Sequence, residues 1–180
     1  MGTETFREAV RADAGALGAL HVASWRETYD GMIPDAVLAA LSVDAKTTMW
    51  KQILDNPAAF DCAAVILAEE RGKTVGFASC GPQRDRALAD AGFSGAFGAI
   101  YVLRSHQRQG IGRSLMATMS EVLLRSGHTG ASLWVLRENT PARAFYTRLG
   151  GIVAGEKTDA RPEATLTEDA YAWRDLSLFW

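Results

Sequence analysis

One segment restricts the fold of this chain more than any other, and it extends from Gly98 to Arg125. It begins with the apolar run Ala99–Leu103, whose β-branched and aromatic residues are typical of a strand covered on both faces. From Ile111 onward, apolar residues recur every three to four positions, which places them on one face of a helix. A short basic stretch with a glycine, residues 104–110, lies between the two. The pattern predicts a buried strand, a tight turn and a long amphipathic helix.

The turn before this helix has the composition of an anion-binding site. The first N–H groups of a helix have no partner within it and carry roughly half a positive charge from the helix dipole. Glycine at positions 110 and 112 lets an anion approach the backbone without meeting a Cβ atom. Basic side chains close in sequence add positive field, namely Arg104, His106, Arg108 and Arg113. We therefore expect the turn to bind a phosphate group.

Two common phosphate-binding motifs match this turn incompletely. A dinucleotide-binding motif has G-x-G-x-x-G directly after a strand, with an acidic residue closing the next strand. Here Leu115 stands in place of the third glycine, whereas Glu138 does close the next predicted strand. A Walker A loop requires Gly-Lys-Ser/Thr, and Gly112-Arg113-Ser114 lacks the lysine. The Walker loop is excluded, and dinucleotide binding stays open as an alternative.

Two motifs follow one another in residues 107–151. The first is Gln107-x-x-Gly110-x-Gly112 after a strand, and the second is LWVLRENTPARAFYTRLGG over residues 133–151. In this order and spacing they resemble the GNAT superfamily of acyl-CoA-dependent N-acetyltransferases, whose first motif holds the coenzyme A pyrophosphate on backbone amides. The resemblance implies the α/β (α+β) GNAT fold. That fold has a mixed, mostly antiparallel sheet of about seven strands, helices on both faces, and fourth and fifth strands that splay apart.

The resemblance also assigns roles to individual residues. Tyr146 stands where the family's general acid usually stands, although it could equally pack beside Phe145 as a core aromatic residue. Asn139 is expected to bond the pantetheine amide and also to cap the following helix. Arg143 is expected near the adenosine phosphate or, as the simpler alternative, as a solvated arginine on the helix. The coenzyme A site implied in full consists of Tyr101, Val102, Gln107, Arg108, Gln109, Gly110, Ile111, Gly112, Arg113, Ser114, Asn139 and Arg143.

The general base is less evident. Many relatives carry a glutamate on the fourth strand, and this chain has Ala96 at that position. Asp85 is the named candidate base. Asp90, Glu27, a water relay or an amine that arrives neutral are alternatives.

The N-terminal segment contributes candidate acceptor residues. Its pattern His21-x-x-x-Trp25-x-x-x-Tyr29-x-x-Met32-Ile33-Pro34 is similar to one in many bacterial small-molecule GNAT proteins, where these helices border the acceptor site. Trp25 and Tyr29 are therefore candidate substrate contacts, although aromatic residues at helical spacing are more often core. His21 is expected to be a packed or helix-surface histidine rather than a base.

The expected function is transfer of an acetyl group from acetyl-CoA to a primary amine of a small molecule or peptide N-terminus, by direct attack in a ternary complex. Because the strand-four glutamate is missing, a catalytically silent acyl-CoA-binding module or sensor is the alternative.

The rest of the chain predicts one domain over residues 1–180. We expect strands at 5–11, 63–68, 74–80, 93–103, 131–137, 152–156 and 170–179, helices at 13–29, 36–41, 44–54, 111–125 and 141–149, and loops at 83–94 and 159–167. The expected connection between the strands at 93–103 and 131–137 is a right-handed crossover, which makes them a parallel pair.

Composition narrows the class of partner and compartment. A net charge of −2 and a pI near 5.9 argue against general nucleic-acid binding. No apolar run approaches the roughly 20 residues of a membrane span. Cys62 and Cys80 form neither a zinc motif nor a disulfide framework, so we expect no metal and a cytoplasmic location. Relatives often dimerise, and the aromatic end, Phe179 and Trp180, is a candidate contact for a homodimer.

Overall fold

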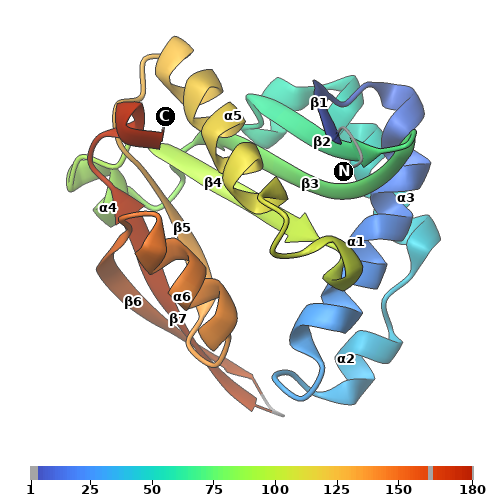
Figure 1. Cartoon of the computed structure of the whole chain (residues 1–180). Helices are drawn as coiled ribbons and strands as arrows, with labels where there is room; N and C mark the ends of the chain where they lie inside the picture. Colours follow the sequence, from blue (N-terminus) through green and yellow to red (C-terminus); the bar gives the residue numbers. More distant parts are fainter. Residues whose placement is uncertain (1–3, 162–163, 180) are drawn as a thin grey trace.

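The computed structural model describes residues 4–161 and 164–179 and contains one seven-stranded sheet (Figure 1). The strand order is β1-β2-β3-β4-β5-β7-β6. The strands are β1 (Glu4–Glu8), β2 (Ala64–Glu70), β3 (Lys73–Pro82), β4 (Gly95–Val102), β5 (Ala131–Leu136), β6 (Ile152–Arg161) and β7 (Ala164–Trp173). Neighbouring strands are antiparallel except β4 and β5, which are parallel. The predicted mixed, mostly antiparallel sheet is confirmed.

Helices cover both faces of this sheet. They are α1 (Ala14–Tyr29), α2 (Asp35–Ala39), α3 (Val43–Asp55), α4 (Arg86–Asp90), α5 (Ile111–Arg125) and α6 (Thr140–Arg148), with short 3-10 turns η1 (Arg11–Asp13), η2 (Pro57–Phe60), η3 (Arg104–His106) and η4 (Leu176–Phe179). Because side chains alternate along a strand, Ile66 of β2 packs with α5 while Leu67 packs with α1 and α3. No helix in the described part of the chain is long and apolar enough to cross a membrane.

The pairing between β4 and β5 is the shortest in the sheet. Only two positions pair across it, Gly95 with Ala131 and Ala96 with Ser132. Beyond them the strands diverge, as Figure 1 shows below the labels of β4 and β5. This splaying is the feature that the resemblance predicted, and it opens the sheet between its two halves.

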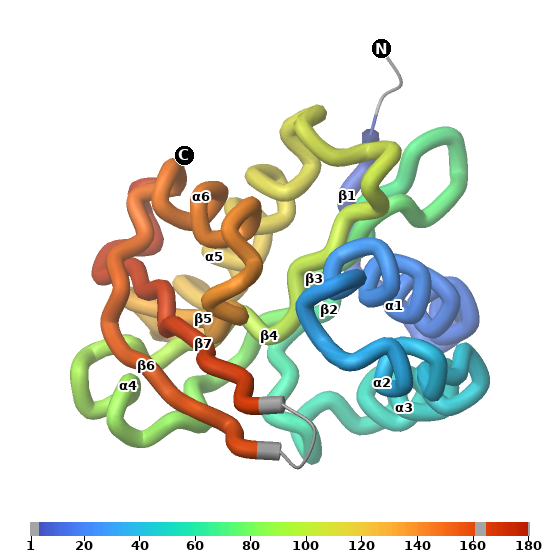
Figure 2. The backbone as a smooth tube through the Cα atoms, turned by 90° about the horizontal axis from the view of Figure 1, so that it is seen from below, coloured from blue at the N-terminus to red at the C-terminus, as the bar shows by residue number. Residues whose placement is uncertain are grey.

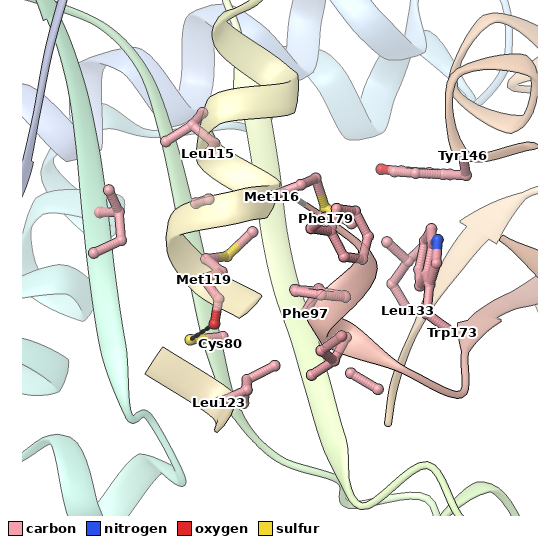
Figure 3. Packing of buried hydrophobic residues seen from close by; sticks show 14 of the residues in the cluster. Cys80, Phe97, Leu115, Met116, Met119, Leu123, Leu133, Tyr146, Trp173 and Phe179 are labelled. Atoms are coloured by element: carbon pink, nitrogen blue, oxygen red, sulfur yellow. Dashed lines mark hydrogen bonds between the residues drawn. The ribbon is translucent and has the colours of Figure 1, made fainter. Parts of the chain in front are cut away.

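The two halves of the sheet are held together by one hydrophobic core, which lies between the sheet and α5 (Figure 3). Leu115, Met116, Met119 and Leu123 are fully buried in a cluster that also contains residues of β4, β5, β7 and η4. Phe179 belongs to it and is only 6% exposed, so it packs in its own chain rather than being free for a partner. Trp180, the other candidate dimer contact, lies outside the described residues.

Four predicted boundaries are wrong for identifiable reasons. The strand predicted at 170–179 ends at Trp173, because Asp175 Oδ1 accepts the Ser177 N–H at 2.9 Å and the chain turns into η4. The strand predicted to reach residue 11 ends at Glu8, because the Asp13 carboxylate accepts the Val10 N–H and stabilises the turn η1, which begins at Arg11. The loop predicted at 83–94 contains α4, which Asp85 caps. Of the loop predicted at 159–167, the described residues 159–161 and 164–167 belong to the paired strands β6 and β7, and their sequence resembles a loop because it has no continuous apolar run.

Candidate active site

The turn between β4 and α5 has the backbone conformation of an anion-binding nest. Gly110 is the N-cap of α5 with a left-handed conformation at φ +91°, and Ile111 continues as right-handed helix. Such an alternation makes consecutive N–H groups converge. Arg108 also has a positive φ, +61°, which is unusual for a non-glycine residue and typical of a functional turn.

Side-chain hydrogen bonds hold this turn in place. Gln107 Nε2 donates to the Val102 carbonyl at 3.0 Å, and Gln109 Nε2 donates to the Ser105 carbonyl at 3.2 Å. The Arg104 N–H donates to Glu27 Oε2 at 2.8 Å. The turn is therefore fixed both to the end of β4 and to α1. Glu27, one of the alternative bases, is used for this purpose.

The two glycines of the turn have different roles. A Cβ atom on Gly110 would meet nothing within 4 Å, so this position is open as predicted. A Cβ atom on Gly112 would lie 3.2 Å from Cζ of Phe145 in α6. Gly112 thus lets α6 pack closely on the start of α5, in addition to lining the cavity beside the turn.

A cavity of about 450 Å³ lies next to the turn, between the diverging strands and α6. Of the predicted coenzyme A residues, those in its lining are Tyr101, Val102, Gln107, Arg108, Gly110, Gly112, Arg113 and Asn139. Arg104 and Arg148 add two further guanidinium groups to the wall. Arg148 was missed because its position on α6 faces the cavity only once α6 is packed against the split. These arginines make the cavity suitable for an anionic ligand.

The remaining predicted residues are placed elsewhere. The cavity's described lining does not contain Gln109, Ile111, Ser114 or Arg143. Ile111 is buried in the core under α5. The Arg143 guanidinium binds Asp169 Oδ2 at 3.1 Å and the Arg137 carbonyl at 3.3 Å, so its contacts secure α6 to the sheet. Asn139 Oδ1 accepts the Ala142 N–H at 3.2 Å, which confirms its predicted role as a helix cap.

Tyr146 lines the same cavity from α6 and is 8% exposed. Figure 3 shows its side chain extending from α6 toward α5 with the hydroxyl at the free end. Burial raises the pKa of Tyr146 well above the usual value for tyrosine. The phenol therefore stays protonated at neutral pH, so its hydroxyl proton is present in the cavity for hydrogen bonding or transfer. Its ring also packs on Trp173, so the core and acid roles considered from the sequence are compatible.

A second cavity of about 980 Å³ lies on the other side of the split. Figure 2 shows the segments that border it, with α1 and α2 on one side of β4 and the β6–β7 hairpin on the other. The two cavities share wall residues at the point where the strands part, namely Tyr29, Phe97, Gly98, Tyr101, Leu133 and Trp134. A ligand in one cavity is thus adjacent to a ligand in the other.

Two tyrosines mark this junction. The hydroxyls of Tyr29, at the end of α1, and Tyr101, on β4, are 3.0 Å apart. Burial raises the pKa of both, so both are neutral hydroxyls able to donate and accept hydrogen bonds. The Trp25 ring packs edge-on against Tyr29 at 5.0 Å and lines the second cavity. The structure therefore brings both candidate acceptor residues to this wall.

His21 is a packed histidine. It is 6% exposed, its Nδ1 accepts the Trp50 Nε1–H at 3.2 Å, and its ring stacks on Tyr101 at 5.8 Å. Burial lowers its pKa to about 4, so the ring is neutral and its remaining proton is on Nε2.

The second cavity has an acidic wall in which most charges are paired. Asp61 binds Arg84 at 3.1 Å and Glu168 binds Lys157 at 3.0 Å. Asp85 lines the cavity and uses Oδ1 to cap α4. Ala96 is in the lining, as expected of the position where relatives carry a glutamate.

Sequence reasoning missed part of this wall. Gln83 Nε2 donates to Ser132 Oγ at 2.6 Å across the closed end of the split, and Ser79 occupies the bulge of β4 by accepting the Ala99 N–H at 3.0 Å. Ser79 lies on β3, Gln83 directly follows β3, and Ser132 lies on β5, and no local sequence pattern marks any of them.

Comparison with known proteins agrees with this architecture. Residues 25–151 match the model of the Acetyltransferase (GNAT) family. The chain is 34% identical over 173 residues to the uncharacterized N-acetyltransferase YuaI of Bacillus subtilis (strain 168), covering 96% of this chain and 94% of that protein. It is also 34% identical over 86 residues to an uncharacterized N-acetyltransferase of Archaeoglobus fulgidus, covering 48% and 58%.

Solved structures share the fold at lower identity. The PaiA N-acetyltransferase from Thermoplasma acidophilum in complex with coenzyme A has a TM-score of 0.69 at 18% identity, covering 94% of this chain and 99% of that one. YncA from Salmonella typhimurium with acetyl-CoA has a TM-score of 0.69 at 19% identity, covering 97% and 94%. The family match decides against the dinucleotide-binding alternative. The chain is an N-acetyltransferase that belongs to the GNAT family of acetyltransferases.

Proposed function

We propose that residues 1–180 act as a single domain that transfers the acetyl group of acetyl-CoA to a primary amine of a small molecule or peptide N-terminus, within a ternary complex. The observation that carries this proposal is the junction of the two cavities at the β4–β5 split, where Tyr29 and Tyr101 face both. A donor bound in one cavity and an acceptor bound in the other would come into contact at this junction. The coenzyme A and acetyl-CoA bound by PaiA and YncA support the choice of donor.

Coenzyme A is proposed to bind in the smaller cavity. The N–H groups at the start of α5, following Gly110, would hold its diphosphate together with Arg108 and Arg113. The pantetheine arm would extend along β4, between Val102 and Asn139, toward the split. This arrangement uses backbone dipoles and guanidinium groups for the charged end and apolar wall for the thioester.

Bound acetyl-CoA supplies an acetyl thioester, and the chain supplies positions and protons around it. Tyr29 and Tyr101 would orient the acceptor amine through hydrogen bonds. As the nitrogen–carbon bond forms and the carbon–sulfur bond breaks, Tyr146 would donate its proton to the departing sulfur. The proton lost by the amine would pass through water to Asp85, a carboxylate in the acceptor wall.

A thiol-release assay with acetyl-CoA and a panel of amines tests this function. Turnover with a primary amine, dependent on the amine concentration and on enzyme, is expected. Ala96 in the position of the family glutamate favours the second candidate, a silent acyl-CoA-binding module. Coenzyme A binding by calorimetry without thiol release from any amine or peptide in the panel would support that alternative.

A further inference from the structure

A lysine of the chain itself lies over an aromatic face in the wall of the acceptor cavity. The Lys157 ammonium is 4.3 Å from the centroid of the Trp134 ring and 3.0 Å from Glu168 Oε2. All three residues line the larger cavity, and Trp134 also lines the coenzyme A cavity. The ammonium is therefore only one aromatic ring away from the junction where transfer is proposed.

The register of the sheet produces this arrangement. Glu168 of β7 pairs with Lys157 of β6 on one side and with Leu136 of β5 on the other, so their side chains share a face. The Trp134 ring lies across Gly155, where a Cβ atom would be 3.7 Å from Cη2. A Cβ atom at this distance would make ordinary van der Waals contact, so Gly155 lies close beneath the indole ring. The indole ring of Trp134 therefore packs on Gly155 of the sheet and also lines the cavity, where the Lys157 ammonium lies over it.

An aromatic face beside a carboxylate is a receptor for a cation, because the ring quadrupole and the negative charge attract the same ammonium. In the structure this position is occupied by the Lys157 ammonium, which is held only by weak interactions. Its side chain is 46% exposed and the pair is a cross-strand surface pair, a type that contributes little to stability. An incoming ligand with a positive charge is able to compete for the same place.

We propose that Trp134 and Glu168 form a seat for a second cationic group of the acceptor, and that Lys157 fills this seat until the acceptor displaces it. The acceptor class is then a diamine, with one nitrogen at Tyr29 and Tyr101 and the other at Glu168. This inference rests on the proposed function, because it takes the larger cavity to be the acceptor site.

A lysine in a cavity wall could instead bind a carboxylate ligand, such as an amino acid. The charges of this wall favour a cationic ligand. Lys157 is already neutralised by Glu168, whereas the other cation of this wall, Arg84, is neutralised by Asp61, and Asp85 adds a further negative charge. The wall therefore attracts cations rather than anions, and the two ligand classes predict opposite effects of removing Lys157.

The test is calorimetric titration of the coenzyme A complex with α,ω-diaminoalkanes of three to eight carbons and with n-alkylamines of matching length. The best diamine should bind wild type roughly fivefold tighter than its matched monoamine. Lys157→Met should tighten diamine binding a further roughly three- to fivefold and leave the monoamine unchanged. Glu168→Gln should abolish the preference for the diamine.

The controls separate the seat from folding and from the proposed function. Glu121→Gln removes the exposed partner of Arg125, outside the described lining of both cavities, and should change neither affinity. Weaker diamine binding in Lys157→Met, tighter binding of amino acids to wild type than to that variant, or a diamine preference that survives in Glu168→Gln overturns the seat. Thiol release measured in parallel reports on the proposed function, since diamine binding without turnover would contradict catalysis while supporting the seat.

Discussion

The two cavities that meet at the β4–β5 split are built in different ways. The groups proposed to bind phosphate in the smaller cavity come mostly from one continuous segment, from Arg104 to Arg113, and include backbone groups at the start of α5. The acceptor cavity is assembled from side chains of α1, β3, β5, β6 and β7, such as Tyr29, Ser79 and Glu168, which are far apart in sequence. A site made by the backbone of one segment leaves a local motif, whereas a site made by distant side chains leaves none.

The largest effect should come from damage to the backbone site. Gly110→Asp places a carboxylate where the diphosphate is proposed to bind and strains a φ of +91°. Coenzyme A affinity, measured by calorimetry, should fall by about 1,000-fold or more, the equivalent of about 4 kcal/mol.

Gly127→Asp is the matched control for this variant. Gly127 follows the other end of α5, has a φ of +87° and also has open space where a Cβ would be. It should lose a similar amount of folding stability, about 1–3 kcal/mol, and keep its coenzyme A affinity. Equal affinities in the two variants would show that the backbone turn is not the phosphate site.

The second effect separates binding from chemistry within the same cavity. Tyr146→Phe should lower kcat by about 100-fold, because the departing sulfur loses its proton donor, and should leave the coenzyme A affinity unchanged. Tyr171→Phe is the control, since this buried ring lies 5.8 Å from Tyr146 and is outside the described cavity lining. A kcat of Tyr146→Phe close to that of Tyr171→Phe would leave Tyr146 as a core residue only.

The third prediction concerns the support beneath the acceptor cavity. His21 has a pKa of about 4 in the folded protein against about 6.5 when unfolded, so the unfolded chain binds a proton more readily. Stability contributed by the neutral ring is complete above pH 6.5 and is lost as the pH falls toward 4. The loss should be about 2 kcal/mol at pH 5.

Urea unfolding at pH 7 and pH 5 measures this loss. His21→Gln keeps an acceptor for the Trp50 indole but cannot titrate, so its stability should fall by about 2 kcal/mol less than that of wild type. Because His21 stacks on Tyr101, acid should loosen the acceptor wall. An identical pH dependence in wild type and variant would contradict the buried neutral histidine.

The difference between the cavities also explains what the sequence could predict. The strand, turn and helix around Gly110 and the parallel β4–β5 pair followed from local patterns, and the splaying of these two strands followed from the resemblance to the GNAT family. The outer part of the β6–β7 hairpin did not, because residues 157–161 of β6 and 165–168 of β7 are mostly polar and show no regular apolar alternation. Lys157 and Glu168 therefore appeared in the site only when the strand register was known.

The smallest effect tests a residue that the sequence suggested and the structure places beside the acceptor. Asp85→Asn keeps an oxygen to cap α4 but removes the carboxylate that is proposed to receive the amine's proton. Turnover should fall by about tenfold, with coenzyme A affinity unchanged. Asp61→Asn is the control, because this carboxylate lines the same cavity but is paired with Arg84. If turnover falls equally in both variants, Asp85 is not the base. The carboxylates would then affect turnover only through the total charge of the cavity wall, and the amine's proton would pass to water.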